Sequence, residues 1–503
     1  MSFGYLKNII DKIKKLDGEV NVYKKVVLNP SLPSLAYVNW AIHLAECGYI
    51  TEAEEKLESS TLMAHQTPES YINLGVLRAR ERKFDEAKEL YIKALNLDHN
   101  SAKAYCFLGN ALTETQDYKE AEKRFADALK IDPNNTDILI NWGISLVRQG
   151  KHLQARDKFQ QACKFQGANL TAIYFLGLVD LELGEMQKAK EKFKMIISMV
   201  SNHFEALYYL AYIHFKSEQY EKSLSYALKS LEVFPKKIET YMLIGENYLN
   251  LKNSQECFKY YQMGENECGF NYFFLISWGI SLQGFDLYPE SIEKFQQAIE
   301  INDKNDLGYA SVATSYFKMK DYDNALVYLQ KTLELNHENY YAMDTLGQIN
   351  LERGNYKEAI DYFTQVLKYS AKLTDNYGKI AKAYAQDGDF AKAEEFYRKA
   401  IEYQPSEIRV YIDYAQFLVE QKDYVQALKR LQKACKIDEK NLDCQNLLFS
   451  VHYILAKENG SDYNMESAIK IAEKIENDYP DSFFYSEEKK ELEERLNSKR
   501  EKQ

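Results

Sequence analysis

Carboxamide side chains recur in this sequence at related intervals. Asn39 and Asn73 are 34 residues apart, Asn141 follows after twice that interval, and Asn110 lies between the last two. A carboxamide offers both N–H donors and a carbonyl acceptor. Amides held at a fixed spacing can therefore pair with both kinds of backbone group along an extended peptide, which predicts recognition rather than catalysis.

A second recurring set is aromatic and follows the amides along the chain. Exposed rings with polar tips often anchor a protein interface. Rings at a regular spacing can equally pack between neighbouring elements, and the sequence leaves both interpretations open. The candidate residues are Tyr174, Phe175, Tyr208, Tyr209, Tyr212 and Phe215.

Side chains suited to catalysis or metal binding are scattered singly. The sequence contains no glycine-rich phosphate loop, no HExxH metal motif and no GxSxG nucleophile motif. We therefore expect no enzyme, no metal site and no cofactor. The histidines are His43, His65, His99, His152, His203, His214, His337 and His452. The cysteines are Cys47, Cys106, Cys163, Cys257, Cys268, Cys435 and Cys444, an odd number without a CxxC pair, which favours small core residues in a reducing compartment.

Composition and charge exclude several classes of protein. The formal charge of −11 argues against a nucleic-acid partner, because phosphates favour a basic face. No 18 apolar residues run together, so we expect no membrane span. The N-terminus MSFGYLKNIIDKIKK lacks an apolar signal segment. These features predict a cytoplasmic protein.

The elements that must position the amides and rings follow a 34-residue period. Twelve repeats, each numbered here from position 1 to 34, fit without a gap between Ser34 and Asn441. Position 8 is always Gly or Ala, and position 20 is always Ala, Ser or Cys. A fixed period with two small residues per unit is typical of a helix-turn-helix solenoid.

Hydrophobic spacing within one repeat predicts its two helices. In repeat 3, Tyr105, Leu108 and Leu112 form one apolar stripe, and a second stripe contains Phe125 before Pro133 ends the helix. We expect small residues at positions 8 and 20 to let the two helices approach. The aromatic residue that is common at position 24 should fill the space toward the next repeat.

These positions resemble the tetratricopeptide-repeat (TPR) family. The residues that carry the resemblance in repeat 3 are Tyr105, Leu108, Gly109, Ala121, Phe125, Ala128 and Pro133. The resemblance implies an all-α fold, a right-handed superhelical solenoid whose first helices line a concave groove that binds protein or peptide. The amides at position 6 are similar to those of the TPR region of O-linked N-acetylglucosamine transferase. Asn is also common there across the family, so family background stays open as an explanation.

The ends depart from the repeat. We expect an atypical N-terminal helical cap over residues 1–33, twelve in-phase repeats over 34–441, a degenerate repeat with an insertion over 442–482, and a charged capping helix over 483–503. The polar segment AKENGSDYN predicts a loop inside the degenerate repeat. The N-terminal helix is amphipathic, so a membrane-surface role stays open as an alternative to capping.

Together these features predict a non-enzymatic protein-interaction scaffold that binds an extended peptide or a partner domain. One alternative is a substrate-recruiting subunit of a glycosyltransferase-like enzyme on another chain. A second is a structural subunit that self-associates as a homo-oligomer. A heat-shock chaperone tail is excluded, because TPR proteins that bind one carry Lys at position 5. That position reads Val38, Ile72, Cys106, Ile140, Tyr174, Tyr208, Met242, Ile276, Ala310, Asp344, Gly378 and Ile412.

Overall fold

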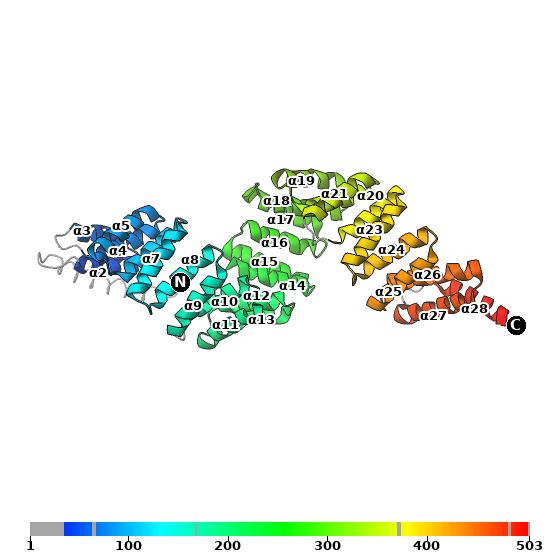
Figure 1. Cartoon of the computed structure of the whole chain (residues 1–503), viewed down its shortest axis with the longest axis horizontal. Coiled ribbons are helices and arrows are strands. Elements are labelled where there is room, and N and C mark those ends of the chain that lie inside the picture. Colours follow the sequence, from blue (N-terminus) through cyan, green and yellow to red (C-terminus); the bar gives the residue numbers. More distant parts are fainter. Residues whose placement is uncertain (1–34, 63–66, 166–168, 370–373, 481–483, 501–503) are drawn as a thin grey trace. The chain divides into compact units, whose positions relative to one another are not determined.

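The computed structural model describes residues 35–62, 67–165, 169–369, 374–480 and 484–500. The predicted N-terminal cap over 1–33 lies outside these residues. Within them the chain is helical and contains no strand, and consecutive helices pack as pairs (Figure 1). The all-α class and the solenoid of helix-turn-helix repeats are confirmed.

The described residues form two compact units, the first ending at Asn247 and the second beginning at Tyr248. In the N-terminal unit, the first helices of the repeats are α2 (Leu35–Glu46), α4 (Pro68–Arg80), α6 (Ala102–Glu114), α8 (Thr136–Arg148), α10 (Leu170–Glu182) and α12 (Phe204–Lys216). Their second helices are α3 (Ile50–Thr61), α5 (Phe84–Leu97), α7 (Tyr118–Ile131), α9 (His152–Phe165), α11 (Met186–Met199) and α13 (Tyr220–Val233). The unit ends within α14 (Ile238–Asn250).

The second unit continues the pattern. Its helices are α15 (Ser254–Cys268), α16 (Tyr272–Gln283), α17 (Tyr288–Ile301), α18 (Asp306–Lys318), α19 (Tyr322–Leu335), α20 (Tyr340–Glu352), α21 (Tyr356–Tyr369), α22 (Asn376–Asp387), α23 (Phe390–Tyr403), α24 (Ile408–Glu420), α25 (Tyr424–Ile437), α26 (Leu442–Asn459), α27 (Asp462–Asp478) and α28 (Ser486–Arg500).

Local signals set where most of the helices begin. Position 34 commonly carries a side chain that accepts a hydrogen bond from the first turn of the next helix, as Ser101, Asn135 and Asn169 do. The turn inside each repeat places position 15 in the left-handed region, which favours glycine. Position 15 is a non-glycine residue in seven of these turns: Arg82, Gln116, Glu218, Lys252, Asp286, Lys320 and Lys422.

In six repeats the core contains a glycine beneath an aromatic ring. A Cβ atom added to Gly143 would lie 2.5 Å from the ring of Phe159, and one added to Gly279 would lie 2.3 Å from Phe295. Real Cβ atoms do not approach this closely, so any larger residue at position 8 of these repeats would force the ring above it to move. The other pairs with this geometry are Gly75 with Tyr91, Gly109 with Phe125, Gly177 with Phe193, and Gly347 with Phe363.

The C-terminal segment corrects one sequence expectation. The predicted AKENGSDYN loop is mostly helical, because α26 continues to Asn459 and α27 begins at Asp462. The extra turns bury Ala456 and Met465 in a cluster that also contains Leu492 of α28. Burial of these apolar side chains stabilises helix where the polar sequence suggested a loop.

Candidate functional site

The predicted amides lie on the first helices of repeats 1 to 4. Asn39 on α2 is exposed, and Asn73, Asn110 and Asn141 on α4, α6 and α8 are half-buried. The amide of Asn73 donates to the carbonyl oxygen of Glu69 at 2.9 Å. Asn141 makes the equivalent bond to Asp137. These bonds fix the two carboxamides against their own helices and leave further amide groups for another molecule.

Asn141 also joins two neighbouring first helices. Its amide nitrogen lies 3.6 Å from the sulfur of Cys106 on α6. Burial raises the pKa of the Cys106 thiol to about 12. The thiol is therefore protonated at neutral pH and acts as a packing group, not a nucleophile.

A small pocket opens beside Asn73. It has a volume of about 210 Å³ and lies between α2 and α4. Its walls are mainly apolar, which suits one apolar side chain, and Arg80 stands at its edge. The lining residues are Ala41, Ile42, Ala45, Leu57, Asn73, Val76, Leu77 and Arg80.

Three of the six predicted aromatic residues pack against core rings, and Tyr174 does so edge-on to Phe193 at 6.2 Å between ring centroids. Phe175 stacks on Phe159 of the preceding repeat, with 5.3 Å between ring centroids. Tyr209 stacks on Phe193 in the same way at 5.1 Å. Phe175 and Tyr209 therefore continue the core from one repeat into the next, so these two residues have a structural role whatever else they contact.

Tyr174 on α10 contacts both Phe175 on its own helix and Tyr209 on α12. Its ring lies 6.1 Å from that of Tyr209, and the two hydroxyl groups share a hydrogen bond. Burial raises the pKa of Tyr174 above its ordinary value. The phenol is therefore neutral at physiological pH and serves as a hydrogen-bonding group.

The remaining three rings are half-buried and lie beside lysines. Lys216 stands over Tyr212 at 5.4 Å and over Phe215 at 5.9 Å. Lys237 stands over Tyr208 at 3.9 Å. Lys237 is not among the residues predicted from the sequence, although a signal was present: it occupies position 34, where most repeats carry an acceptor that caps the next helix.

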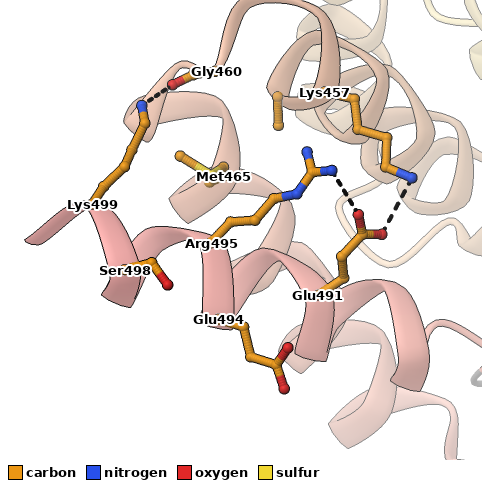
Figure 2. A pocket seen from close by; sticks show the side chains of 9 residues that line it. Lys457, Gly460, Met465, Glu491, Glu494, Arg495, Ser498 and Lys499 are labelled. Carbon is orange, nitrogen blue, oxygen red and sulfur yellow. Dashed lines mark hydrogen bonds and ion pairs between the residues drawn. The ribbon is translucent and has the colours of Figure 1, made fainter.

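The C-terminal helices enclose a separate pocket of about 490 Å³ (Figure 2). Its charged side chains satisfy one another. Glu491 pairs with Lys457 at 3.2 Å and with Arg495 at 3.0 Å, and Lys499 donates to the carbonyl of Gly460. This mutual pairing gives no reason to assign the pocket a ligand.

Two further features concern only the residues that the structure describes. Those residues contain no cluster of three His, Cys, Asp or Glu side chains that could hold a metal ion. Among the same residues, no helix has both the length and the apolar character needed to cross a membrane.

Comparison with known proteins identifies the repeat. Two tetratricopeptide-repeat models match the chain, one at residues 66–134 and 307–372 and the other at 384–448. No curated protein matches. The resemblance of the amides to those of O-linked N-acetylglucosamine transferase stays a prediction.

Several solved structures are similar to the chain. Yeast Tom70 is 14% identical, with 88% of this chain and 99% of that chain covered and a TM-score of 0.46. Cut9 in the Cut9–Hcn1 hetero-tetramer of the APC/C is 14% identical, with 84% and 100% covered and a TM-score of 0.40. PilF of Pseudomonas aeruginosa is 21% identical, with 40% and 90% covered and a TM-score of 0.37. At these scores the likenesses carry no argument about function.

Proposed function

We propose, from the premise that this chain is a multi-repeat tetratricopeptide-repeat protein, that it is a non-enzymatic scaffold that binds an extended segment of a partner protein. The segment would lie along the first helices of repeats 1 to 6. The observation that carries the proposal is the pair of carboxamides, Asn73 and Asn141, each fixed by a bond to its own helix. Such fixed groups lose little freedom on binding. A cytoplasmic location is part of the same proposal.

The spacing of the repeats suits such a segment. Neighbouring first helices pack about 10 Å apart, and an extended peptide advances about 3.3 Å per residue. Each repeat would therefore address about three ligand residues, and six repeats would hold about 18. In this arrangement the amides hold the ligand backbone and the half-buried rings select side chains.

Affinity capture with mass spectrometry would identify the partner, and a set of variants would then test the surface. Replacing Asn39, Asn73 and Asn141 with Ala should weaken capture by about 1 kcal/mol for each hydrogen bond lost. A matched control replaces three exposed asparagines that lie off the first helices. These are Asn96, Asn100 and Asn134.

Equal capture by the two triple variants would contradict the proposed surface. Light scattering of the isolated chain gives a second check. A mass that rises with concentration would support the self-associating alternative in place of a groove that binds another protein.

A further inference from the structure

Lys237 breaks a local rule of the repeat. It immediately precedes α14 (Ile238–Asn250), at the position where Asn135, Asn169 and Asn271 cap the helices that follow them. A lysine has no acceptor and cannot make this bond. Lys237 is therefore a costly choice for the fold at this position, which suggests a functional reason for it.

The lysine side chain lies among three aromatic rings. Its ammonium nitrogen is 3.9 Å from the ring centroid of Tyr208, 5.6 Å from Phe204 and 5.7 Å from Tyr209. We call these three rings the aromatic box. Rings at such distances attract a cation through their negative faces. The box thus has the geometry of an ammonium-binding site, and the chain's own lysine occupies it.

Nearby carboxylates favour a positive ligand in the box. Burial lowers the pKa of Lys237, and nearby Glu239 and Glu205 oppose that shift. Glu239 and Glu246 also act on Tyr208, whose pKa is raised mainly by burial. The acidic surroundings would attract a cation from a partner and repel an anionic segment.

We propose that the aromatic box is a binding site for a lysine side chain of the partner segment, and that Lys237 is an internal competitor that occupies the box until the partner displaces it. The inference rests on the proposed function, because the box lies on α12, one of the proposed binding helices. Exchange of one ammonium for another keeps the charge in the box constant. Displacement would also release the Lys237 side chain to solvent, where an ammonium is better hydrated.

The test replaces Lys237 with Asn, the residue found at this position in other repeats. Lys237→Asn should restore the helix cap and raise the melting temperature, so loss of folding will not confuse the result. The probe is a short acetylated peptide in which lysine alternates with glutamine, and titration calorimetry of the full chain measures its binding. Removing the competitor should tighten binding on the order of tenfold, as expected when a site is mostly occupied by an internal group.

Lys236→Asn is the matched control. Lys236 is exposed and lies next to Lys237, so this variant removes the same charge without changing the box. It should not tighten binding of the lysine peptide. A peptide with norleucine in place of each lysine should bind neither variant. Adding Tyr208→Ala to Lys237→Asn should remove the gain.

Two outcomes would overturn the inference. One is unchanged affinity in Lys237→Asn, and the other is an equal gain in Lys236→Asn. Either result would leave the proposed function standing if the asparagine variants still lose partner capture. If the proposed groove does not bind the partner, the asparagine variants should instead capture the partner normally.

Discussion

Repeats 4 and 6 solve the same packing problem in opposite ways. In repeat 4, Gly143 lies beneath the ring of Phe159, so one large side chain fills the space between the two helices. In repeat 6 the same two positions are Ala211 and Ala227, both fully buried. Repeat 6 therefore has no core ring at position 24, and its helices must be joined by other contacts.

Hydrogen bonds supply those contacts in repeat 6. The hydroxyl of Ser223 donates to the carbonyl of Ala211 at 2.8 Å and accepts from the amide of Asn247 at 2.9 Å. The hydroxyl of Ser230 donates to the carbonyl of Phe204 at 2.9 Å. Buried polar groups that are satisfied in this way fix one arrangement of the helices.

Five aromatic side chains of repeat 6 lie on its first helix, α12, and two others, Tyr220 and Tyr226, lie on its second helix, α13. Tyr208 and Tyr212 on α12 are half-buried and contact lysines. The repeat that has alanine at position 24 thus also carries these lysine–ring contacts on its first helix. Departures from a local rule concentrate at functional sites, and this coincidence favours repeat 6 as part of the binding surface.

The largest expected effect concerns the glycine of repeat 4. Gly143→Leu would force a side chain into the ring of Phe159 and should destabilise the repeat by about 3 kcal/mol or more. Lys123→Leu, at an exposed site on α7, should change stability by less than about 0.5 kcal/mol. Chemical denaturation of both variants measures the difference. Similar losses at the two sites would reject the assigned register.

A double-mutant cycle would test whether Gly143 and Phe159 form one unit. Gly143→Ala alone should destabilise by about 1–3 kcal/mol, because its Cβ would meet the ring. Adding Phe159→Leu should recover part of that loss, since repeat 9 pairs Ala313 with Leu329 at the same two positions. We expect a coupling energy of about 1 kcal/mol.

Additive effects would show that the two positions are independent. Gly378→Ala provides a control in a helix. No atom lies within 4 Å of the Cβ that it would add, so this variant should be more stable, by about 0.5–1 kcal/mol.

The smallest expected effect is a pH dependence confined to repeat 6. Burial lowers the pKa of His214 below its ordinary value of 6.5, the hydrogen bond from its Nδ1–H to Oε1 of Gln219 opposes this, and Lys190, Lys222 and Lys194 reinforce it. The unfolded state then binds a proton at a higher pH than the folded state. Stability should therefore fall as the pH drops from 6.5 toward the lowered pKa.

His214→Leu should remove that dependence, since repeat 3 carries Leu112 at this position. Denaturation of the full chain on both sides of pH 6.5 measures it. If the free energies of unfolding of the wild type and of His214→Leu differ by the same amount at every pH, the assignment to His214 is wrong.

Much of the fold could be predicted from the sequence. The period placed Gly143 and Phe159 at recurring positions. The sequence also contains a signal of their steric pairing, because repeats with a ring at position 24 have Gly at position 8. Repeats with Leu at position 24, which are those of Leu57, Leu329 and Leu431, have Ala at position 8. Tyr397 above Ala381 is an exception. The helical extension around Gly460 was missed because the apolar contacts of Ala456 and Met465 with α28 are tertiary.

The candidate site was less predictable. Repeat position placed Phe175 and Tyr209 on first helices, but could not distinguish stacking on a core ring from exposure, because that depends on side-chain orientation. Lys237 lies in a loop, and its contact with Tyr208 depends on how that loop directs the side chain. The only sequence signal for Lys237 was its place at position 34, where most repeats carry a residue that caps the next helix.

The central claim is that the rings of repeats 5 and 6 bind a partner as well as pack. The most direct test measures partner capture and melting temperature for two double variants. Tyr208→Ala with Tyr212→Ala should weaken capture by at least about 2 kcal/mol with little change in melting. Phe175→Ala with Tyr209→Ala should lower the melting temperature, because both rings stack on the core. Normal capture together with a much lower melting temperature in the Tyr208 and Tyr212 variant would contradict the claim.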